Sequence, residues 1–228
     1  MHSKKRVQMS DLHEAFEALA GFAAPDALTL RIGALERQLA DQSRERAMGE
    51  LEAEAITPEL LQAALSVKRL AGQINVIVHA VGILVSLSYV LEPGERIEEL
   101  SLGAGNTGRR HDLETDRQVA EFKFIEWRGG AESIRQNNLF VDLFNLASAD
   151  TDKRRVLYVV GKTEPMRFLQ NRRALDSVLS KNAAVAGRFR ERHAGRFRTV
   201  NEYYMSVASL VEIVDLAELV PALARRHL

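Results

Sequence analysis

The spacing of apolar residues changes abruptly at Pro93 and Gly94, and this change separates a helical part of the chain from a part that contains strands. Before it, Thr57 and Pro58 have the form of an N-cap followed by proline at the first helical position, so a long helix is expected to begin there. After it, Arg96 to Leu102 is typical of a short strand that leads into a glycine-rich loop. The fold is therefore expected to change from α to β at this point.

Two strands joined by a tight turn are expected next. Arg110 to Glu114 and Gln118 to Ile125 alternate polar and apolar residues, and Thr115-Asp116-Arg117 supplies the turn. A two-residue turn and a four-residue loop both give the same register, in which Asp112 faces Glu121, whereas a three-residue loop would shift the pairing. The pattern predicts an antiparallel hairpin.

A helix and two more strands complete the expected order. Apolar residues at helical spacing predict a helix over about 134–148, and the continuous apolar run Val156 to Val160 is typical of a strand buried on both faces. Leu210 to Leu216 is expected to form the last strand, with a short helix from Ala217. This alternation of helices and strands predicts an α/β fold.

Length, charge and cysteine content narrow the classes of protein that need to be considered. The 228 residues suffice for one α/β domain with an appendage. Lysine plus arginine and aspartate plus glutamate both number 31, so any nucleic-acid binding must come from a local basic patch. The absence of cysteine excludes disulfides, thiolate catalysis and cysteine-ligated metal sites, and it fits a cytoplasmic protein. The basic start of the chain lacks the apolar run of an export signal.

The first 57 residues are expected to form a helical arm. Leu28, Ile32, Leu35 and Leu39 recur at spacings of four and three, which is typical of a short apolar stripe on a helix. The stripe either packs on the chain's own domain, or contacts a partner or forms a homodimer through the N-terminal helices. The rest of the chain, 58–228, is expected to be one domain.

The stretch Ile74 to Leu91 is apolar enough to raise the question of a membrane span. It contains Asn75, His79 and Gly82, and it is barely long enough to cross a bilayer. We expect a buried core helix here rather than a span, and no membrane association.

The predicted hairpin brings two carboxylates and a lysine to one face. Directly opposed residues have Cβ atoms roughly 4.5 to 5.5 Å apart, so Asp112 and Glu121 could hold one hard cation between them. Lys123 lies two residues after Glu121 and points to the same side, whereas Ala120 and Phe122 point to the other side and supply a core face.

Asp112, an interval of eight residues, and Glu121-Phe122-Lys123 resemble the signature of the PD-(D/E)XK, restriction-endonuclease-like nuclease superfamily. The expected element order resembles its αβββαβ core, a mixed central sheet flanked by helices. The similarity extends from the helix near residue 75 to the strand that ends near residue 161. It leaves the N-terminal arm and the last third of the chain uncovered.

The resemblance implies a metal-dependent nuclease that acts on DNA in restriction, repair or defence. Asp112 and Glu121 would be metal ligands with the Phe122 carbonyl as a third, Lys123 would position or activate water, and magnesium, or alternatively manganese, would be the ion. His111 stands where many members have proline, a difference expected to touch nothing chemical. The alternative function is a non-catalytic interaction module that keeps a nuclease-like fold.

Three further residues have both a functional and a structural interpretation. Gln136, followed by Phe140, resembles the Gln-x-x-x-Tyr of RecB-type nucleases and is a candidate catalytic residue, the alternative being an exposed helical glutamine. Glu114 is either a third carboxylate of the site or a solvated side chain at the hairpin end. Trp127 is expected to lie at the rim of the core.

The segment 162–198 is strongly basic. It carries ten lysines and arginines against three acidic residues, and it repeats Gly-Arg-Phe-Arg at 187–190 and 195–198. We expect four of its arginines to contact phosphates, while a solvated, partly disordered linker is the alternative. The four are Arg188, Arg190, Arg196 and Arg198.

Overall fold

The computed structural model describes residues 9–23, 28–103, 110–125, 127 and 132–224 of the chain. Its residues divide into two compact units, Met1–Asn75 and Val76–Leu228, and the boundary falls within the long helix α4 (Pro58–Val90). The sequence predicts the domain boundary at residue 57, just before this helix begins.

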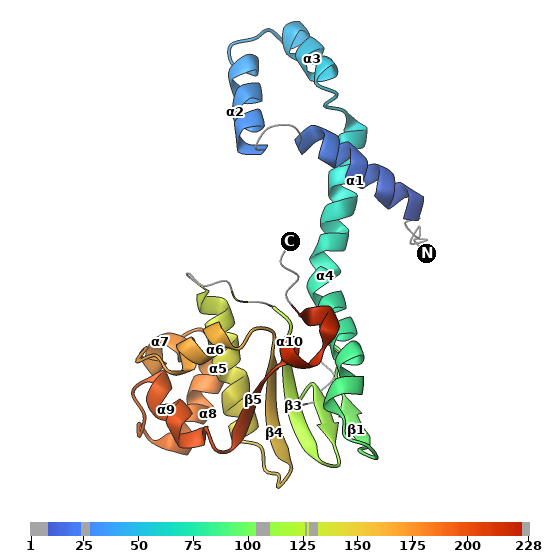
Figure 1. The fold of residues 1–228 in the computed structure, drawn as a ribbon. Coiled ribbons are helices and arrows are strands. Elements are labelled where there is room, and N and C mark those ends of the chain that lie inside the picture. Colours follow the sequence, from blue (N-terminus) through green and yellow to red (C-terminus); the bar gives the residue numbers. More distant parts are fainter. Residues whose placement is uncertain (1–8, 24–27, 104–109, 126, 128–131, 225–228) are drawn as a thin grey trace, which may run out of the picture. The chain divides into compact units, whose positions relative to one another are not determined.

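The first unit contains three shorter helices and the first turns of α4 (Figure 1). The three are α1 (Met9–Ala23), α2 (Leu28–Leu39) and α3 (Arg44–Ala53). α4 begins as predicted, because Thr57 Oγ1 accepts a hydrogen bond from the Leu60 N–H at 3.3 Å. α2 has no buried residue, and Leu28, Leu30 and Ile32 are exposed, so both interpretations of its apolar stripe stay open.

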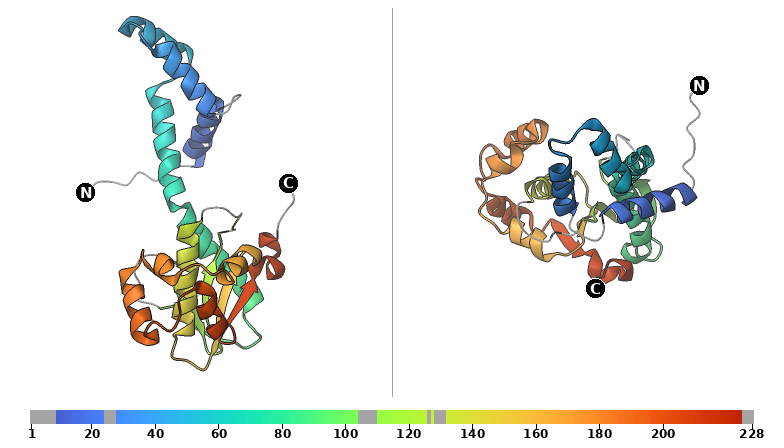
Figure 2. Two further views of the ribbon diagram at one scale, coloured as in Figure 1. Left: turned by 90° about the vertical axis from the view of Figure 1, so that its left-hand side faces the viewer. Right: turned by 90° about the horizontal axis from the view of Figure 1, so that it is seen from above.

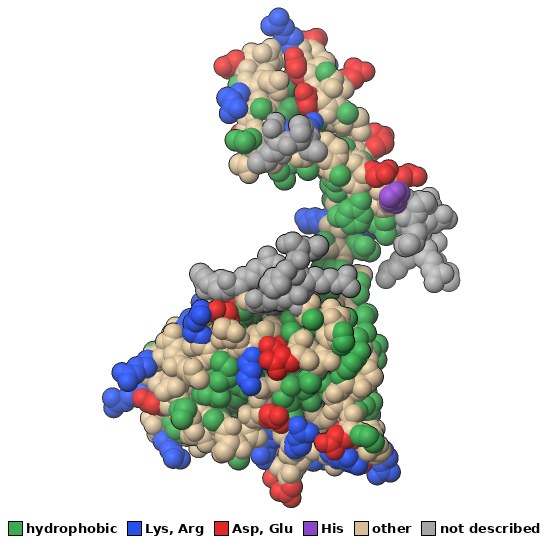
Figure 3. All heavy atoms as spheres, in the orientation of Figure 1, with side chains coloured by type: hydrophobic (Ala, Val, Ile, Leu, Met, Phe, Trp, Pro, Cys, Tyr) green, Lys and Arg blue, Asp and Glu red, His purple; other side chains and the backbone are tan. Residues whose placement is uncertain are grey.

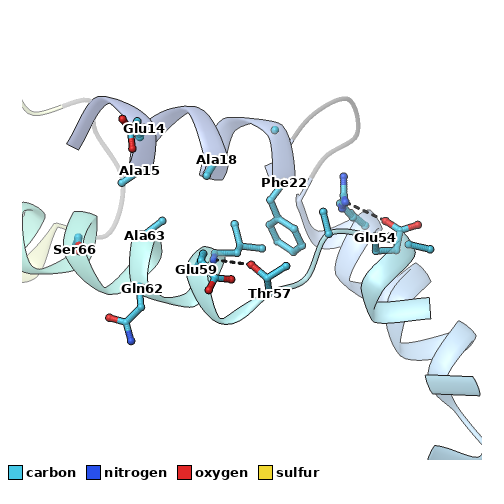
Figure 4. Close-up of a pocket in the computed structure, with 15 residues that line it drawn as sticks. Glu14, Ala15, Ala18, Phe22, Glu54, Thr57, Glu59, Gln62, Ala63 and Ser66 are labelled. Carbon is cyan, nitrogen blue, oxygen red and sulfur yellow. Dashed lines mark hydrogen bonds and ion pairs between the residues drawn. The ribbon is translucent and has the colours of Figure 1, made fainter. Parts of the chain in front are cut away.

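A groove of about 710 Å³ lies inside the first unit, between α1 and the start of α4 (Figure 4). Ala15 and Ala18 of α1 face Ala63 of α4 across it. At one end, Arg31 pairs with Glu54 at 3.0 Å, and its guanidinium lies over the Phe22 ring at 4.8 Å. Small side chains line most of the groove.

The second unit is built on a five-stranded sheet in the order β1-β2-β3-β4-β5. β1 to β3 pair antiparallel, whereas β3, β4 and β5 run parallel, so the sheet is mixed. The α/β class is thus confirmed. The strands are β1 (Ile97–Leu100), β2 (Leu113–Thr115), β3 (Gln118–Lys123), β4 (Arg154–Val159) and β5 (Val211–Asp215).

The hairpin of β2 and β3 has the predicted register, because Leu113 pairs with Ala120 and Glu114 with Val119. Thr115 Oγ1 accepts hydrogen bonds from the N–H groups of Arg117, at 3.0 Å, and Gln118, at 2.8 Å, and these bonds fix the turn. β2 is shorter than predicted, so Asp112 lies just before the strand.

Helices cover both faces of the sheet (Figures 1 and 2). In the left view of Figure 2, α5 to α9 lie in front of the sheet, and their apolar residues pack with Val119, Leu157 and Val159. On the other face, the end of α4 and α10 pack over Ala120 and Phe122. The helices that follow α4 are α5 (Ser133–Ala147), α6 (Thr163–Leu169), α7 (Leu175–Leu179), α8 (Ala183–His193), α9 (Val200–Val207) and α10 (Leu216–Leu219), followed by a 3-10 turn at Pro221–Leu223.

The basic segment 162–198 contains three of these helices, so the alternative of a disordered linker is wrong. Phe189 is buried in an aromatic cluster with Phe140, Phe144 and Tyr203, where ring centroids lie 5.0–6.2 Å apart. The phenylalanine of the first Gly-Arg-Phe-Arg repeat therefore belongs to the core.

The prediction that Ile74 to Leu91 forms a buried core helix is wrong for most of that stretch. Only Ile83, Ser86 and Val90 of α4 are buried, because a single face of the helix reaches the sheet. By length and composition alone, α4 is apolar enough to cross a membrane. Its end is held by Gln118, whose Nε2 donates to the Val90 carbonyl at 3.1 Å.

Candidate functional site

The candidate site forms where the start of β2 meets the end of β3. Asp112 and Glu121 directly adjoin the paired residues Leu113 and Ala120, and their carboxyl groups interact with each other. Asp112 Oδ2 accepts a hydrogen bond from the Phe122 N–H at 2.9 Å. Local strand pairing thus brings the two carboxylates together, as the sequence predicts.

Glu121 has the most perturbed acidity in the site. Its side chain is buried, and this burial, together with the neighbouring charges of Asp142 and Asp112, raises its pKa to about 9 although Lys123 opposes the shift. Near neutral pH, Glu121 therefore holds a proton in the metal-free protein.

Lys123 forms an ion pair with Asp142 of α5, with Nζ and Oδ2 2.7 Å apart. Burial raises the pKa of the Asp142 carboxyl although Lys123 opposes this shift. Burial alone would lower the pKa of Lys123, but Asp142, Glu121 and Asp112 together raise it. Lys123 is therefore a positively charged group that is fixed by its ion pair with Asp142 and surrounded by three carboxyls.

His79 of α4 approaches the site from the other face of the sheet. Its Nε2 lies 3.2 Å from Asp112 Oδ1, and its ring stands edge-on to Phe124 with centroids 6.1 Å apart. Burial opposes ionisation of Asp112, but the hydrogen bonds from His79 and the Phe122 N–H outweigh it and lower the pKa. Asp112 is thus the ionised carboxylate of the pair.

The close fit of α4 against β3 explains how His79 reaches this position. A Cβ atom added to Gly82 would lie 2.6–2.7 Å from the ring of Phe124, closer than packed atoms approach. Glycine at this point leaves room for the Phe124 ring between the helix and the strand. The helix therefore carries His79 to the edge of the hairpin.

His111 lies within the site, and the expectation that it touches nothing chemical is wrong. Its Nδ1 is 3.4 Å from Glu121 Oε1, and both side chains are largely buried. Burial lowers the pKa of His111, with the charge of Arg110 contributing, although nearby carboxylates oppose the shift. A neutral imidazole beside Glu121 is a potential metal ligand or proton acceptor.

Gln136 is paired with another residue. Arg173 donates to its Oε1, and both Gln136 and Trp127 line a small pocket of about 210 Å³. The side chain of Trp127 is buried and packs against Phe168, which confirms its place at the core rim. Glu114 accepts from Lys153 Nζ at 2.9 Å, so it is engaged in a salt bridge.

The donor set fits a divalent cation only in part. Among the described residues, no group of three His, Cys, Asp or Glu side chains converges to hold a metal ion. Magnesium, however, is usually bound by one or two carboxylates, with water and substrate phosphates completing its shell. Asp112 and Glu121, with the Phe122 carbonyl, supply the hard oxygens that such an ion prefers.

The four arginines of the basic segment that are expected to contact phosphates have different environments. Arg188 donates to Asn145 Oδ1 at 3.0 Å, and its guanidinium lies 5.6 Å from the centre of the Phe144 ring. Arg190 lies 3.6 Å from Asp176, and the guanidinium of Arg196 is over the Phe197 ring. The backbone N–H of Arg198 donates to Glu202.

Sequence reasoning missed the contributions of His79, His111 and Asp142. Asp142 carried a usable signal, because it is a lone acidic residue in the apolar run 139–144. His79 is likewise the only ionisable side chain within the apolar stretch of α4 from Ala71 to Val85. An isolated ionisable group inside an apolar run points to a buried partner.

Comparison with known proteins supplies no relative. No family model matches the chain, and no significant match was found among curated proteins or among solved structures.

Proposed function

We propose that the chain is a metal-dependent nuclease of the restriction-endonuclease-like type, hydrolysing phosphodiester bonds of DNA. The observation that carries the proposal is the buried Glu121 beside Asp112, with Asp142 and Lys123 forming an ion pair next to them. Three carboxyls around a single lysine leave an excess of buried negative charge unless a proton or a cation compensates it.

The order of elements supports the finer fold assignment. α4, β1, β2, β3, α5 and β4 follow one another in the αβββαβ order of the superfamily, with the carboxylates on the middle hairpin. The order of elements does not establish an activity, so the proposed nuclease activity rests on the chemistry of the site residues.

Each residue has a definite role in the proposed reaction. Asp112 and Glu121 would hold magnesium or manganese, and the bound ion would supply a water of lowered pKa and neutralise charge on the phosphate. His79 keeps Asp112 ionised and oriented. Lys123, kept charged by Asp142, stabilises the negative charge that develops on the phosphate oxygens.

The competing proposal is an interaction module without catalysis. The ion pair of Lys123 with Asp142 and the contact of His79 with Asp112 would then be structural. Burial of Glu121 speaks against a solvated surface cluster, and buried carboxyls placed side by side repel one another unless a proton or a cation compensates their charge. A role in restriction, repair or defence and a cytoplasmic location remain part of the nuclease proposal.

Cleavage assays test the proposal directly. Purified protein is incubated with supercoiled plasmid, linear duplex, single-stranded DNA and RNA, in magnesium, in manganese or in chelator. We expect DNA cleavage that requires the metal and is abolished in Asp112→Asn. Asp150→Asn, the same chemical change at an exposed loop position, should cleave like wild type. Absence of cleavage on every substrate with either metal would favour the interaction module.

A further inference from the structure

Helix α4 carries a second apolar surface that its packing on the sheet leaves exposed. Ile77, Val81 and Leu84 are 44%, 51% and 49% exposed. Figure 3 shows hydrophobic side chains along the surface of this helix. Apolar side chains that remain this exposed in an uninterrupted row are typical of an interaction surface.

This row lies on a different side of the helix from the residues that pack on the sheet. At 3.6 residues per turn, Ile77, Val81 and Leu84 form one stripe, while Ile83 and Val90 point around the helix toward the sheet. The row can therefore be covered by a partner without disturbing the packing of α4 on β3.

The row follows a heptad pattern, with apolar residues at alternating spacings of three and four. We call it the α4 seam; its residues are Val67, Leu70, Ile74, Ile77, Val81 and Leu84. Residues three positions apart form the pairs Val67 and Leu70, Ile74 and Ile77, and Val81 and Leu84. The first residue of each pair is valine or isoleucine, and the second is leucine or isoleucine. β-branched residues at the first position with leucine at the second favour parallel two-stranded coiled coils.

We propose that the α4 seam is a homodimer interface, in which α4 of a second copy packs in parallel as a two-stranded coiled coil. A heptad stripe packs against another helix with the same repeat, and α4 of a second copy is such a helix. Burying the exposed parts of these side chains would remove on the order of 500 Å² of surface per copy, or about 1,000 Å² in total, which is the lower limit for a specific interface.

A lipid bilayer is the other occupant that such a surface could take, and the packing of α4 disfavours it. A span needs about 20 consecutive apolar residues. Because Lys68 and Arg69 precede the apolar part of α4, such a span would have to include residues 79–90. That part of α4 packs on the sheet, and its His79 lies 3.2 Å from Asp112. A bilayer around this segment would have to displace the sheet from the helix.

Sedimentation of the full chain over a range of concentrations tests the proposal. We expect a dimer of about twice the 25.5 kDa chain mass. Ile77→Glu with Leu84→Glu should weaken dimerisation by roughly a hundredfold or more, because like charges would then face each other in an apolar interface. Val76→Glu changes an exposed valine outside the seam and should leave the dimer intact.

A cross-linking experiment avoids the risk that the charged variants fail to fold. Because the chain has no cysteine, Leu84→Cys introduces a single thiol that should meet its own copy and form a disulfide-linked dimer under mild oxidation. Val76→Cys should stay monomeric on a denaturing gel. A monomeric wild type, equal cross-linking of both variants, or recovery only from membranes with detergent would each overturn the proposal. None of these measurements depends on nuclease activity.

Discussion

Metal binding at the proposed site should release a proton from Glu121. The metal-free carboxyl is protonated near neutral pH, because burial and the neighbouring carboxyls raise its pKa to about 9. A cation that takes Glu121 as a ligand must displace this proton. Each unit of pH between 6 and 8 should therefore raise the affinity about tenfold, which amounts to about a hundredfold, or about 2.7 kcal/mol, over the two units.

The same group should make the metal-free protein less stable as the pH rises. Its folded pKa of about 9 lies above the ordinary value of 4.5, so its contribution is fully present below pH 4.5 and is lost as the pH rises toward 9. Glu121→Gln should remove this dependence. Asp112 has the opposite effect on the pH dependence of stability. Because its pKa is lowered in the folded state, it stabilises the fold at neutral pH, and this contribution is lost as the pH falls into the acid range.

Titration calorimetry with manganese at pH 6, 7 and 8, in two buffers of different ionisation enthalpy, measures both the affinity and the number of protons released. We expect about one proton per ion in wild type and none in Glu121→Gln. Glu218→Gln, at an exposed position, is the control and should behave like wild type. An affinity that does not change between pH 6 and 8, with no proton release, would mean that the ion does not displace a proton from Glu121.

Three further outcomes follow from the same contacts. His79→Ala removes the hydrogen bond to Asp112 and should weaken manganese binding by about 10- to 100-fold in the same titration, while His13→Ala should not. Asp142→Asn leaves the partly buried Lys123 without its counter-ion and should lower the free energy of unfolding by about 2 kcal/mol in urea denaturation; an unchanged value would mean that the pair is not formed. If the basic segment holds duplex DNA, replacing four of its arginines by glutamine should reduce the slope of log affinity against log salt by about 0.9 per lost phosphate contact, and an unchanged slope would place the DNA elsewhere. These are Arg188, Arg190, Arg196 and Arg198.

The parts of the fold that local sequence determines could be predicted. The turn at Thr115 fixes the hairpin register, so the proximity of Asp112 and Glu121 could be predicted from the spacing of the two strands. The N-cap at Thr57 likewise marks the start of α4. Such features depend on residues a few positions apart, and short-range geometry is readable from sequence.

The rest of the site depends on long-range packing. His79 meets Asp112 because α4 packs closely over Phe124 at Gly82, and Asp142 meets Lys123 because α5 crosses the same face of the sheet. Periodicity shows that a helix is apolar, but it does not show how many of its faces are covered. The burial of α4 was overpredicted for that reason.

Lys123→Ala separates a nuclease from a binding module most directly. The variant removes the charge beside the carboxylates and leaves Asp112 and Glu121 in place, so DNA binding in calcium should stay within a few-fold of wild type. Cleavage in magnesium should fall by about a hundredfold to a thousandfold, about 3 to 4 kcal/mol, because the lysine acts mainly on the transition state. Lys153→Ala is the matched control, since that lysine is also ion-paired, to Glu98 at 2.6 Å, outside the site.

Both quantities are measured on one preparation of each variant, after circular dichroism has shown that it is folded. We predict retained binding with lost cleavage for Lys123→Ala, and wild-type values of both for Lys153→Ala. Undiminished cleavage by Lys123→Ala would contradict this prediction.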